Sequence, residues 1–241
     1  MKVHSQTDVG LVRTVNEDAC SAGLLGKNGA WAVVCDGMGG ANGGEIASQT
    51  AVKSIEQQIL SAYEEDFKKE IKLLLNTLVY HANAAVYDMA QEDESLKGMG
   101  TTVIVAIVLD HVAHIAHVGD SRAYLLHNGN IMQLTTDHSM VQELIKNGDL
   151  TVEQAKVHPQ KNIITRALGV NPVVEIDYVT VALKEQDRIL ICTDGLTNYI
   201  EADEIRKMAD TLDSVTLTDR LVASAKEYGG GDNITVAILD N

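Results

Sequence analysis

This sequence has little proline and no long apolar run. Only 2 of its 241 residues are proline, and no serine- or glycine-rich linker marks a domain boundary. No window approaches the ~18 consecutive apolar residues that a membrane span requires, and the first six residues lack the apolar stretch of a signal peptide. We therefore expect a single domain over residues 1–241, located in the cytoplasm.

Basic residues are also scarce. The chain has 19 Lys and Arg against 34 Asp and Glu, a formal net charge of −15. Nucleic acids and anionic membranes bind surfaces with clustered Lys and Arg, so we expect neither as a partner. We expect a monomer whose acidity belongs in part to a functional site. With 45% hydrophobic residues, a chain of this length can bury a sizeable core.

Cysteine is too rare for a disulfide framework. Cys20, Cys35 and Cys192 are odd in number and show no CxxC spacing, which is typical of reduced thiols in a reducing compartment. Cys35 and Cys192 lie within apolar runs. We interpret both as small buried hydrophobic residues.

The most informative feature present is a set of four acidic turns, each bordering a β-branched apolar run. These turns are Asp36-Gly37-Met38-Gly39-Gly40, Gly119-Asp120-Ser121, Thr193-Asp194-Gly195 and Gly231-Asp232-Asn233. One Asp-Gly pair alone indicates only a turn. Four at strand ends can bring their carboxylates together if the strands share a core, and Asp18 is a candidate fifth ligand. Because these are hard oxygen donors without Cys or His at ligand spacing, the pattern favours Mg²⁺ or Mn²⁺ over Zn²⁺.

Hydrophobic periodicity predicts strands and helices in separate parts of the chain. Residues 101–109 with 112–118, and 122–127 with 130–134 around Asn128-Gly129, are expected to form hairpins, and 173–183, 188–193 and 233–239 further strands. Apolar stripes predict helices over 71–86 and 47–59, with others near 219–228 and from Ser139 onward. This pattern alone indicates an α+β fold of antiparallel sheets with helices packed outside.

The motifs, taken in order, resemble one family almost end to end. The matching segments are Thr7 to Gly10, Arg13, Asn16 to Asp18, Asp36 to Gly40 with Gly44-Glu45, Gly98 to Thr102, His117 to Arg122, Thr136 to Ser139, His158-Pro159, Ile164 to Gly169, Thr193 to Thr197 and Gly231 to Thr235. They are similar to the metal-dependent protein serine/threonine phosphatases (the protein phosphatase 2C-like, or PPM, family) in compact bacterial form. The resemblance implies a central two-sheet antiparallel β-sandwich flanked by helix pairs, with metals at one end.

The resemblance also implies a binuclear metal site and a reaction. Asp36 would bridge two Mn²⁺ or Mg²⁺ ions, Asp194 and Asp232 would complete one of them, and the Gly37 carbonyl would serve the other. Asp18 would ligate directly or through water. A third, weaker ion would be held by Asp120 with Asp194, with a structural turn as the alternative interpretation of Gly119-Asp120-Ser121. The implied activity is hydrolysis of phosphoserine and phosphothreonine in phosphoproteins by a metal-bridging water, opposing a bacterial Ser/Thr kinase.

Other residues receive narrower expectations from the same resemblance. Arg13 would anchor the substrate phosphate, because a guanidinium offers a fork of donors that fits two phosphoryl oxygens. Residues 139 to about 164, here called the flap, match a variable segment beside the active site that is thought to influence substrate choice. Arg122 and Arg166 are interpreted as structural.

The sequence departs from the family pattern where a general acid is usual. Many bacterial relatives have His directly after the first acidic turn and eukaryotic ones have His two residues after the Asp, whereas this chain has Ala41 and Met38 there. His138 remains as a candidate general acid, with a structural or helix-capping role as the alternative. Otherwise water at the metal would protonate the leaving group.

Different classes of function stay open beside the phosphatase. A binding module that has lost catalysis is expected to lack a metal-binding Asp, and none is missing here. A phosphodiesterase or nuclease would usually bring His ligands or a basic groove. A cysteine-dependent phosphatase is excluded, because the residues six positions after the three cysteines are Gly26, Ala41 and Asn198 rather than Arg. Kinase and P-loop motifs are absent from the sequence.

Overall fold

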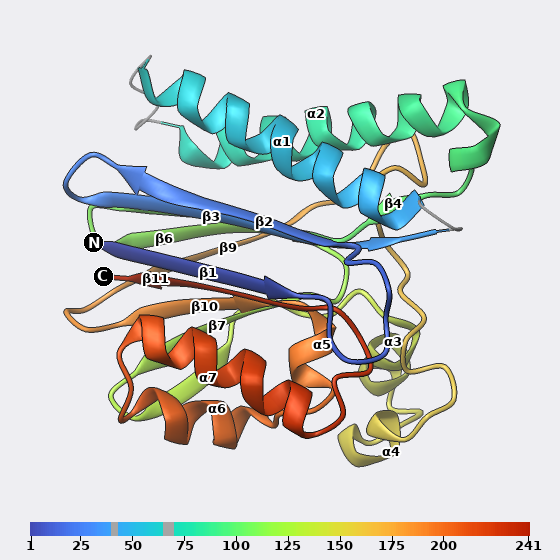
Figure 1. The fold of residues 1–241 in the computed structure, drawn as a ribbon. Coiled ribbons are helices and arrows are strands. Elements are labelled where there is room, and N and C mark those ends of the chain that lie inside the picture. Colours follow the sequence, from blue (N-terminus) through green and yellow to red (C-terminus); the bar gives the residue numbers. More distant parts are fainter. Residues whose placement is uncertain (40–42, 65–69) are drawn as a thin grey trace.

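The computed structural model describes residues 1–39, 43–64 and 70–241 and shows two sheets stacked face to face between two layers of helices (Figure 1). The first sheet has the order β1 (Lys2–Asp8), β11 (Ile234–Asp240), β10 (Arg188–Cys192), β7 (Arg122–His127), β8 (Asn130–Gln133). The second has the order β2 (Asp18–Leu25), β3 (Gly29–Met38), β5 (Val103–Leu109), β6 (Val112–Val118), β9 (Asp177–Ala182), with β4 (Gly100–Thr101) paired to β3. Each pairing of these strands is antiparallel.

Helices cover the outer faces of both sheets. The long helices α1 (Gly43–Glu64) and α2 (Ile71–Glu92) lie on the second sheet, followed by the short 3₁₀ turn η2 (Glu94–Leu96). The first sheet carries α5 (Asp194–Thr197), α6 (Ala202–Ala209) and α7 (Ser214–Glu227). The stripe predicted for α2 is buried, including Leu75, Leu78 and Val86. The predicted two-sheet sandwich with flanking helices is therefore confirmed.

The alternation of side chains along the strands divides the core into three layers. On β3, Trp31, Val33 and Cys35 belong to the cluster beneath α1 and α2, whereas Ala30 and Val34 belong to the cluster between the sheets. A strand with both faces buried reads as a nearly continuous apolar run, because each face contacts a different apolar layer. The third cluster lies between the first sheet and α5, α6 and α7.

The antiparallel register brings the acidic turns to one end of the sandwich. Asp18 at the start of β2 pairs directly with Asp36 near the end of β3. In the other sheet, Cys192 at the end of β10 pairs with Val236 near the start of β11, so Asp194 and Asp232 follow and precede paired strand ends. Asp120 lies in the turn between β6 and β7. The strands thus place five carboxylates at the right-hand end of Figure 1.

The flap lies between β8 and β9 at this same end. It contains α3 (Met140–Asn147) and α4 (Val152–Lys156), and an antiparallel bridge between Ser139 and Ile164 joins its two ends. Ser139 caps α3, accepting a hydrogen bond at 3.3 Å from the Gln142 amide, so the helix predicted to start there is confirmed. The capping residue is Ser139, so His138 does not serve as the cap.

Several predicted boundaries differ from the observed ones. The strand predicted over 101–109 is divided at Thr102, whose hydroxyl and amide bond to the Asp36 backbone instead of continuing a ladder. The strand predicted over 173–183 is confined to Asp177–Ala182. Among the described residues, no helix is both long and apolar enough to cross a membrane.

Candidate functional site

A cavity of about 290 Å³ opens at the end of the sandwich where the acidic turns meet. Four of the five candidate carboxylates line it, and Asp18 lies buried beside it. The lining residues are Arg13, Glu17, Asp36, Gly37, Met38, Gly39, Thr102, Asp120, Asn162, Ile164, Asp194, Asp232 and Asn233. The sequence prediction that these strand ends converge is therefore correct for the carboxylates.

Backbone contacts hold Asp36 in place. Its amide donates to the Thr102 hydroxyl at 2.9 Å, and its carbonyl accepts from the Thr102 amide at 2.8 Å. Gly37 follows, and a Cβ there would lie 2.0 Å from the Gly44 carbonyl oxygen, so only glycine fits this close approach of two chain segments. Burial, followed by the charges of Asp18 and Asp194, raises the pKa of Asp36 well above its ordinary value.

Asp18 is 5% exposed and bonds through only one of its oxygens. Its Oδ2 accepts from the hydroxyls of Thr193 at 2.9 Å and Thr235 at 2.7 Å. Its Oδ1 is buried and has no partner among the residues that the structure describes. Burial raises the pKa of Asp18 to about 7, although the two hydroxyls oppose the shift. A buried carboxylate with one unsatisfied oxygen is expected to need a further cation or hydrogen-bond donor.

Asp120 and Asp194 repel each other across the cavity. Burial and the charge of Asp194 raise the pKa of Asp120 to about 7, and burial and the charge of Asp232 raise that of Asp194. Asn198 partly compensates Asp194, donating from Nδ2 to its Oδ2 at 3.0 Å. Buried carboxylates whose charges raise the pKa of their neighbours concentrate negative charge in the way that a cation site requires.

Arg13 reaches the rim of this cavity and pairs with Asp232. Its Nη2 and Nε atoms each lie 3.0 Å from one of the two Asp232 carboxylate oxygens, and Nη1 lies 3.7 Å from Glu17. The Arg13 side chain is 47% exposed. A half-exposed guanidinium beside the carboxylates is available to an anion that enters the cavity.

His138 lies outside the lining of this cavity, in a cluster of its own. It is 6% exposed, and its Nδ1 accepts from the Gly119 amide at 3.1 Å. Its Nε2 lies 3.3 Å from Asp177, and its ring stacks on His117 with 4.7 Å between centroids. Both ring nitrogens of His138 therefore contact groups other than the five candidate metal-binding carboxylates. The structure does not bring His138 together with the other predicted site residues, and this geometry gives no support to a general-acid role.

The remaining predicted residues fall into three groups. Arg122 makes three hydrogen bonds to Asp137, and Arg166 pairs with Asp177 and Glu175, which confirms their structural interpretation. Met38 lines the cavity, whereas Ala41 and Gly40 lie outside the described residues. Cys35 and Cys192 are fully buried free thiols, as predicted.

Sequence reasoning missed the residues that support the carboxylates. The hydroxyls of Thr193 and Thr235 hold Asp18, and Asn198 holds Asp194. From the flap, Asn162 and Ile164 line the cavity. Thr193 and Thr235 could have been found, because each lies beside an acidic turn on strands that pair in register. Asn198 follows Asp194 by one helical turn, a spacing that allows the contact.

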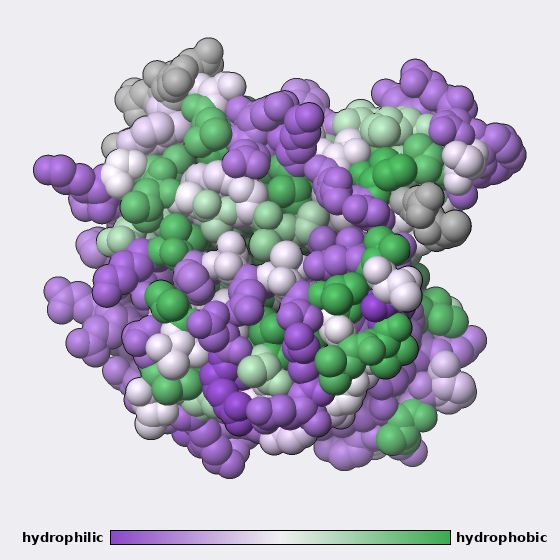
Figure 2. Space-filling view, in the orientation of Figure 1, coloured by the Kyte–Doolittle hydropathy of each residue, from purple (hydrophilic) through white to green (hydrophobic). Residues whose placement is uncertain are grey.

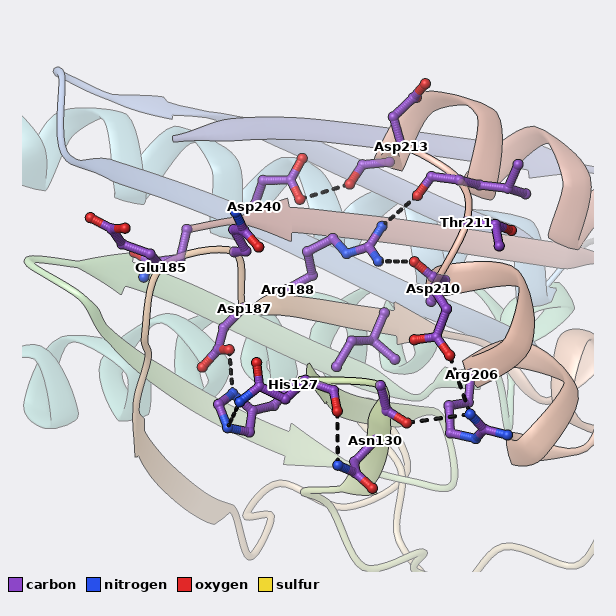
Figure 3. A pocket seen from close by; sticks show the side chains of 18 of the residues that line it. His127, Asn130, Glu185, Asp187, Arg188, Arg206, Asp210, Thr211, Asp213 and Asp240 are labelled. Carbon is purple, nitrogen blue, oxygen red and sulfur yellow. Dashed lines mark hydrogen bonds and ion pairs between the residues drawn. The ribbon is translucent and has the colours of Figure 1, made fainter.

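A larger cavity of about 640 Å³ lies at the opposite end of the sandwich (Figure 3). Several of its side chains pair with one another: His127 contacts Asp187 at 2.5 Å, and Arg206 contacts Asp210 at 3.2 Å. Arg188 donates to the carbonyls of Leu212 and Ala209 at the end of α6. Because Lys2, Arg188 and Arg206 lie among its acidic side chains, this cavity lacks the concentration of like charge that marks the smaller one.

The rim that carries Arg13 is apolar on its outer side. Leu11 and Val12, in the loop between β1 and β2, are 63% and 69% exposed. Figure 2 shows green, hydrophobic surface over this loop at the right of the molecule. The path to the carboxylates therefore begins on a partly apolar surface.

Comparison with known proteins agrees with this site. A family model described as Protein phosphatase 2C matches residues 12–228. The serine/threonine phosphatase stp of Listeria monocytogenes is 39% identical, covering 100% of this chain and 96% of that protein, and the protein phosphatase PhpP of Streptococcus pneumoniae is 38% identical, covering 99% and 97%.

Solved structures give the same result. The serine/threonine phosphatase of S. agalactiae superposes with a TM-score of 0.91 at 35% identity, covering 100% of this chain and 99% of that one. The catalytic domain of the serine/threonine protein phosphatase PstP, solved with two manganese ions, superposes with a TM-score of 0.88 at 31% identity, covering 99% and 97%. With a family model over most of its length and relatives matched from end to end, the chain belongs to the protein phosphatase 2C family.

Proposed function

We propose that this phosphatase hydrolyses phosphoserine and phosphothreonine in proteins and depends on two Mn²⁺ or Mg²⁺ ions, with a third ion bound more weakly. The relatives named as serine/threonine phosphatases and the manganese-bound neighbour support the reaction and the metal class. The observation that carries the proposal is the convergence of five carboxylates, with the pKa of Asp18 and Asp120 raised to about 7 by burial.

The donor set fits hard divalent cations. Every candidate ligand is a carboxylate or backbone oxygen, and the buried Asp18 Oδ1 lacks a partner among the described residues. Asp36, Asp194 and Asp232 with the Gly37 carbonyl would hold the two ions, Asp18 would contribute its free oxygen, and Asp120 with Asp194 would hold the weaker one. When bound, such ions lower the pKa of a coordinated water and offset charge on the phosphoryl oxygens.

The chain's own groups then bind and orient the substrate. Arg13 stands at the rim, where its guanidinium can take two phosphoryl oxygens as it now takes the two oxygens of Asp232. Asn198, Thr193 and Thr235 fix the carboxylates from behind, so the site is arranged before the substrate arrives. The exposed Leu11 and Val12 offer an apolar surface to the polypeptide that carries the phosphate.

We further infer that residues 1–241 act as one catalytic domain whose flap, residues 139–164, borders the site, and that the protein works as a monomer in the cytoplasm opposite a bacterial Ser/Thr kinase. The flap contributes Asn162 and Ile164 to the cavity lining, which supports a part in substrate choice.

One assay tests the proposed reaction. Phosphate release is measured from an aryl phosphate and from phosphoserine, phosphothreonine and phosphotyrosine peptides, each with Mn²⁺, Mg²⁺ or a chelator. We expect metal-dependent turnover of the aryl phosphate and of the phosphoserine and phosphothreonine peptides. Turnover that persists in chelator, or that favours the phosphotyrosine peptide, would overturn the proposal.

A further inference from the structure

His138 forms hydrogen bonds with the peptide units on both sides of Gly119, which directly precedes Asp120. Its ring Nδ1 accepts from the Gly119 amide at 3.1 Å, and its own amide donates to the Gly119 carbonyl at 2.9 Å. Gly119 has φ +108°, and a Cβ there would lie 2.6 Å from the Thr102 side chain. Only glycine suits this turn, which packs closely against Thr102 on one side and is hydrogen-bonded to His138 on the other.

The bond to Gly119 fixes the tautomer of His138. A backbone N–H can only donate, so Nδ1 is the acceptor and the ring hydrogen sits on Nε2. Nε2 lies 3.3 Å from Oδ2 of the Asp177 carboxylate, whose Oδ1 is held by Arg166 at 3.0 Å. Asp177, at the start of β9, thereby orients the ring for its contact with the metal-site turn.

The same cluster could be mistaken for a metal site. Ligand atoms of His117, His138 and Asp177 all lie within 4.8 Å of one another. However, binding a metal through Nε2 requires the hydrogen on Nδ1, which the Gly119 amide already occupies as a donor. The Arg166 guanidinium, 3.3 Å from Nε2, would also repel a cation. The geometry favours an orienting cluster.

His138 also anchors the flap. Its carbonyl accepts from the Thr165 amide at 2.8 Å, and the next residue, Ser139, forms the bridge to Ile164. Ile164 and Asp120 both line the cavity, one from the flap and the other from the β6–β7 turn. One buried residue thus joins two walls of the site that are far apart in the sequence.

We propose that His138 is a positioning residue, which holds the Gly119–Asp120 turn against the end of the flap and so sets the affinity of the Asp120 carboxylate for a divalent cation. This inference rests on the proposed function, in which Asp120 is a metal ligand. His138 acts through its hydrogen bonds to Gly119 and its contact with Asp177, and it touches neither substrate nor cation.

Three substitutions separate the two ends of the ring. In His138→Asn, the amide oxygen stands the same number of bonds from Cα as Nδ1 and can still accept from Gly119. In His138→Gln, the amide nitrogen stands where Nε2 does and can reach only Asp177. His138→Ala removes both contacts. His81→Gln, on the exposed face of α2, is the matched control.

Two measurements are made on each variant. Hydrogen–deuterium exchange of the Gly119 amide, followed by NMR without metal, reports the contact itself. Calorimetric titration with Mn²⁺ resolves the weakest site, assigned with Asp120→Asn. We expect His138→Gln and His138→Ala to accelerate Gly119 exchange and to weaken the weakest Mn²⁺ site by about 10-fold each, the size of one lost hydrogen bond. The tighter sites should be unchanged, and His138→Asn and the control should resemble wild type.

Failure of this inference is distinct from failure of the proposed function. If Asp120→Asn removes no Mn²⁺ site, the ligand role of Asp120 is wrong and the inference falls with it. If Asp120→Asn removes a site but His138→Gln and His138→Ala alter neither Gly119 exchange nor Mn²⁺ affinity, only the positioning role is wrong. Equal losses in His138→Asn and His138→Ala would likewise overturn it, because the acceptor at the Nδ1 position would then not matter. Should His138→Ala fail to fold, His138→Gln against His138→Asn gives the same decision.

Discussion

The two ends of the sandwich are both rich in acidic residues, but the partners of these acidic side chains differ between the ends. At the end shown in Figure 3, Asp187 accepts from His127 and from the Lys184 amide, Asp210 pairs with Arg206, and Asp240 accepts from Ser214. At the other end, burial and the charges of neighbouring carboxylates raise the pKa values of Asp36, Asp120 and Asp194. The larger cavity is at the satisfied end.

This difference shows what identifies a site in an acidic protein. Neither the number of carboxylates nor the size of a cavity distinguishes the ends. The distinguishing quantity is buried charge that the described residues leave uncompensated, as in the unpaired Oδ1 of Asp18. Such an arrangement lowers the stability of the folded chain, so it is expected only where a ligand supplies the missing positive charge.

The sharpest test of the comparison is to neutralise one acid at each end. Asp36→Asn, Asp194→Asn or Asp232→Asn should each lower kcat by at least about 10²-fold, because a neutral amide cannot balance divalent cations. The fold should be retained, since each substitution relieves repulsion. Phosphatase kinetics at saturating Mn²⁺ and circular dichroism on the same preparations check this. Near wild-type turnover in any of the three would refute the assigned metal site.

At the opposite end, Asp187→Asn should lower stability without lowering turnover. Asp187 is 3% exposed and accepts at both oxygens, so an amide there loses an acceptor and costs about 1–3 kcal/mol of unfolding free energy. Turnover should be unchanged. Denaturant unfolding with parallel kinetics gives the answer, and a loss of activity without loss of stability would contradict the division between the ends.

A second pair compares the arginines. Arg13→Ala should lower kcat/KM by roughly 10- to 10³-fold, the effect of losing one or two charge-assisted hydrogen bonds to phosphate. Mn²⁺ binding should not weaken, because the substitution removes a cation from beside Asp232. Arg188→Ala should leave kcat/KM unchanged while lowering stability, since Arg188 closes the end of α6. Phosphatase kinetics and Mn²⁺ titration on both variants test this comparison. An unaltered kcat/KM in Arg13→Ala would show that Arg13 is a solvated surface charge and does not bind the phosphate.

Metal addition should stabilise the protein through one end only. At about 100 times its dissociation constant, a bound ion adds about 2.7 kcal/mol, which corresponds to a rise in Tm of about 5–10 °C for a chain of this size. Asp36→Asn should lose most of this rise and Asp187→Asn should keep it. Thermal melts with Mn²⁺ and with chelator provide the measurement, and equal shifts in the two variants would argue against the site.

The smallest effect concerns pH in chelator. The pKa of Asp18 is raised from 3.8 to about 7, so its protonated form stabilises the fold fully below about pH 4, and this contribution is lost as the pH rises toward 7. His117 and His138 act oppositely, because burial lowers their pKa and stability falls as they gain protons. Asp18→Asn should therefore flatten the fall in Tm between about pH 4 and 7 by a few degrees. Identical slopes in wild type and variant would show that Asp18 does not titrate in this range.

Much of the fold could be predicted because its local signals agree with its tertiary structure. The stripe over 71–86 and the turn at Asn128-Gly129 each produced the expected element. The short helix α6 was missed, since its 8 residues are too few for a reliable periodicity and only Ile205 and Ala209 are buried. The break at Thr102 was missed because its cause is a contact with Asp36, 66 residues away.

The candidate site divides in the same way. Its carboxylates could be identified because each lies at or near the end of an apolar strand in a recognisable motif, and the structure brings them to one end. The general acid could not, because His138 lies in a matching motif although its ring points into a buried cluster set by Gly119 and Asp177. The direction of a side chain depends on partners that are distant in the sequence, so it cannot be predicted from a sequence motif.

The register of the β2–β3 hairpin determines which residues meet in the site. Its 8 residue pairs run without interruption from Leu25 and Gly29, beside the turn, to Asp18 and Asp36 in the site. The pairing continues strand-long from the three-residue turn Gly26-Lys27-Asn28, and a register shifts as a whole. The geometry of this turn therefore helps to set which carboxylates lie opposite each other at the far end. A slip of one residue would also exchange the two buried faces of β3, so the packing of its apolar side chains on both sides keeps Asp18 opposite Asp36.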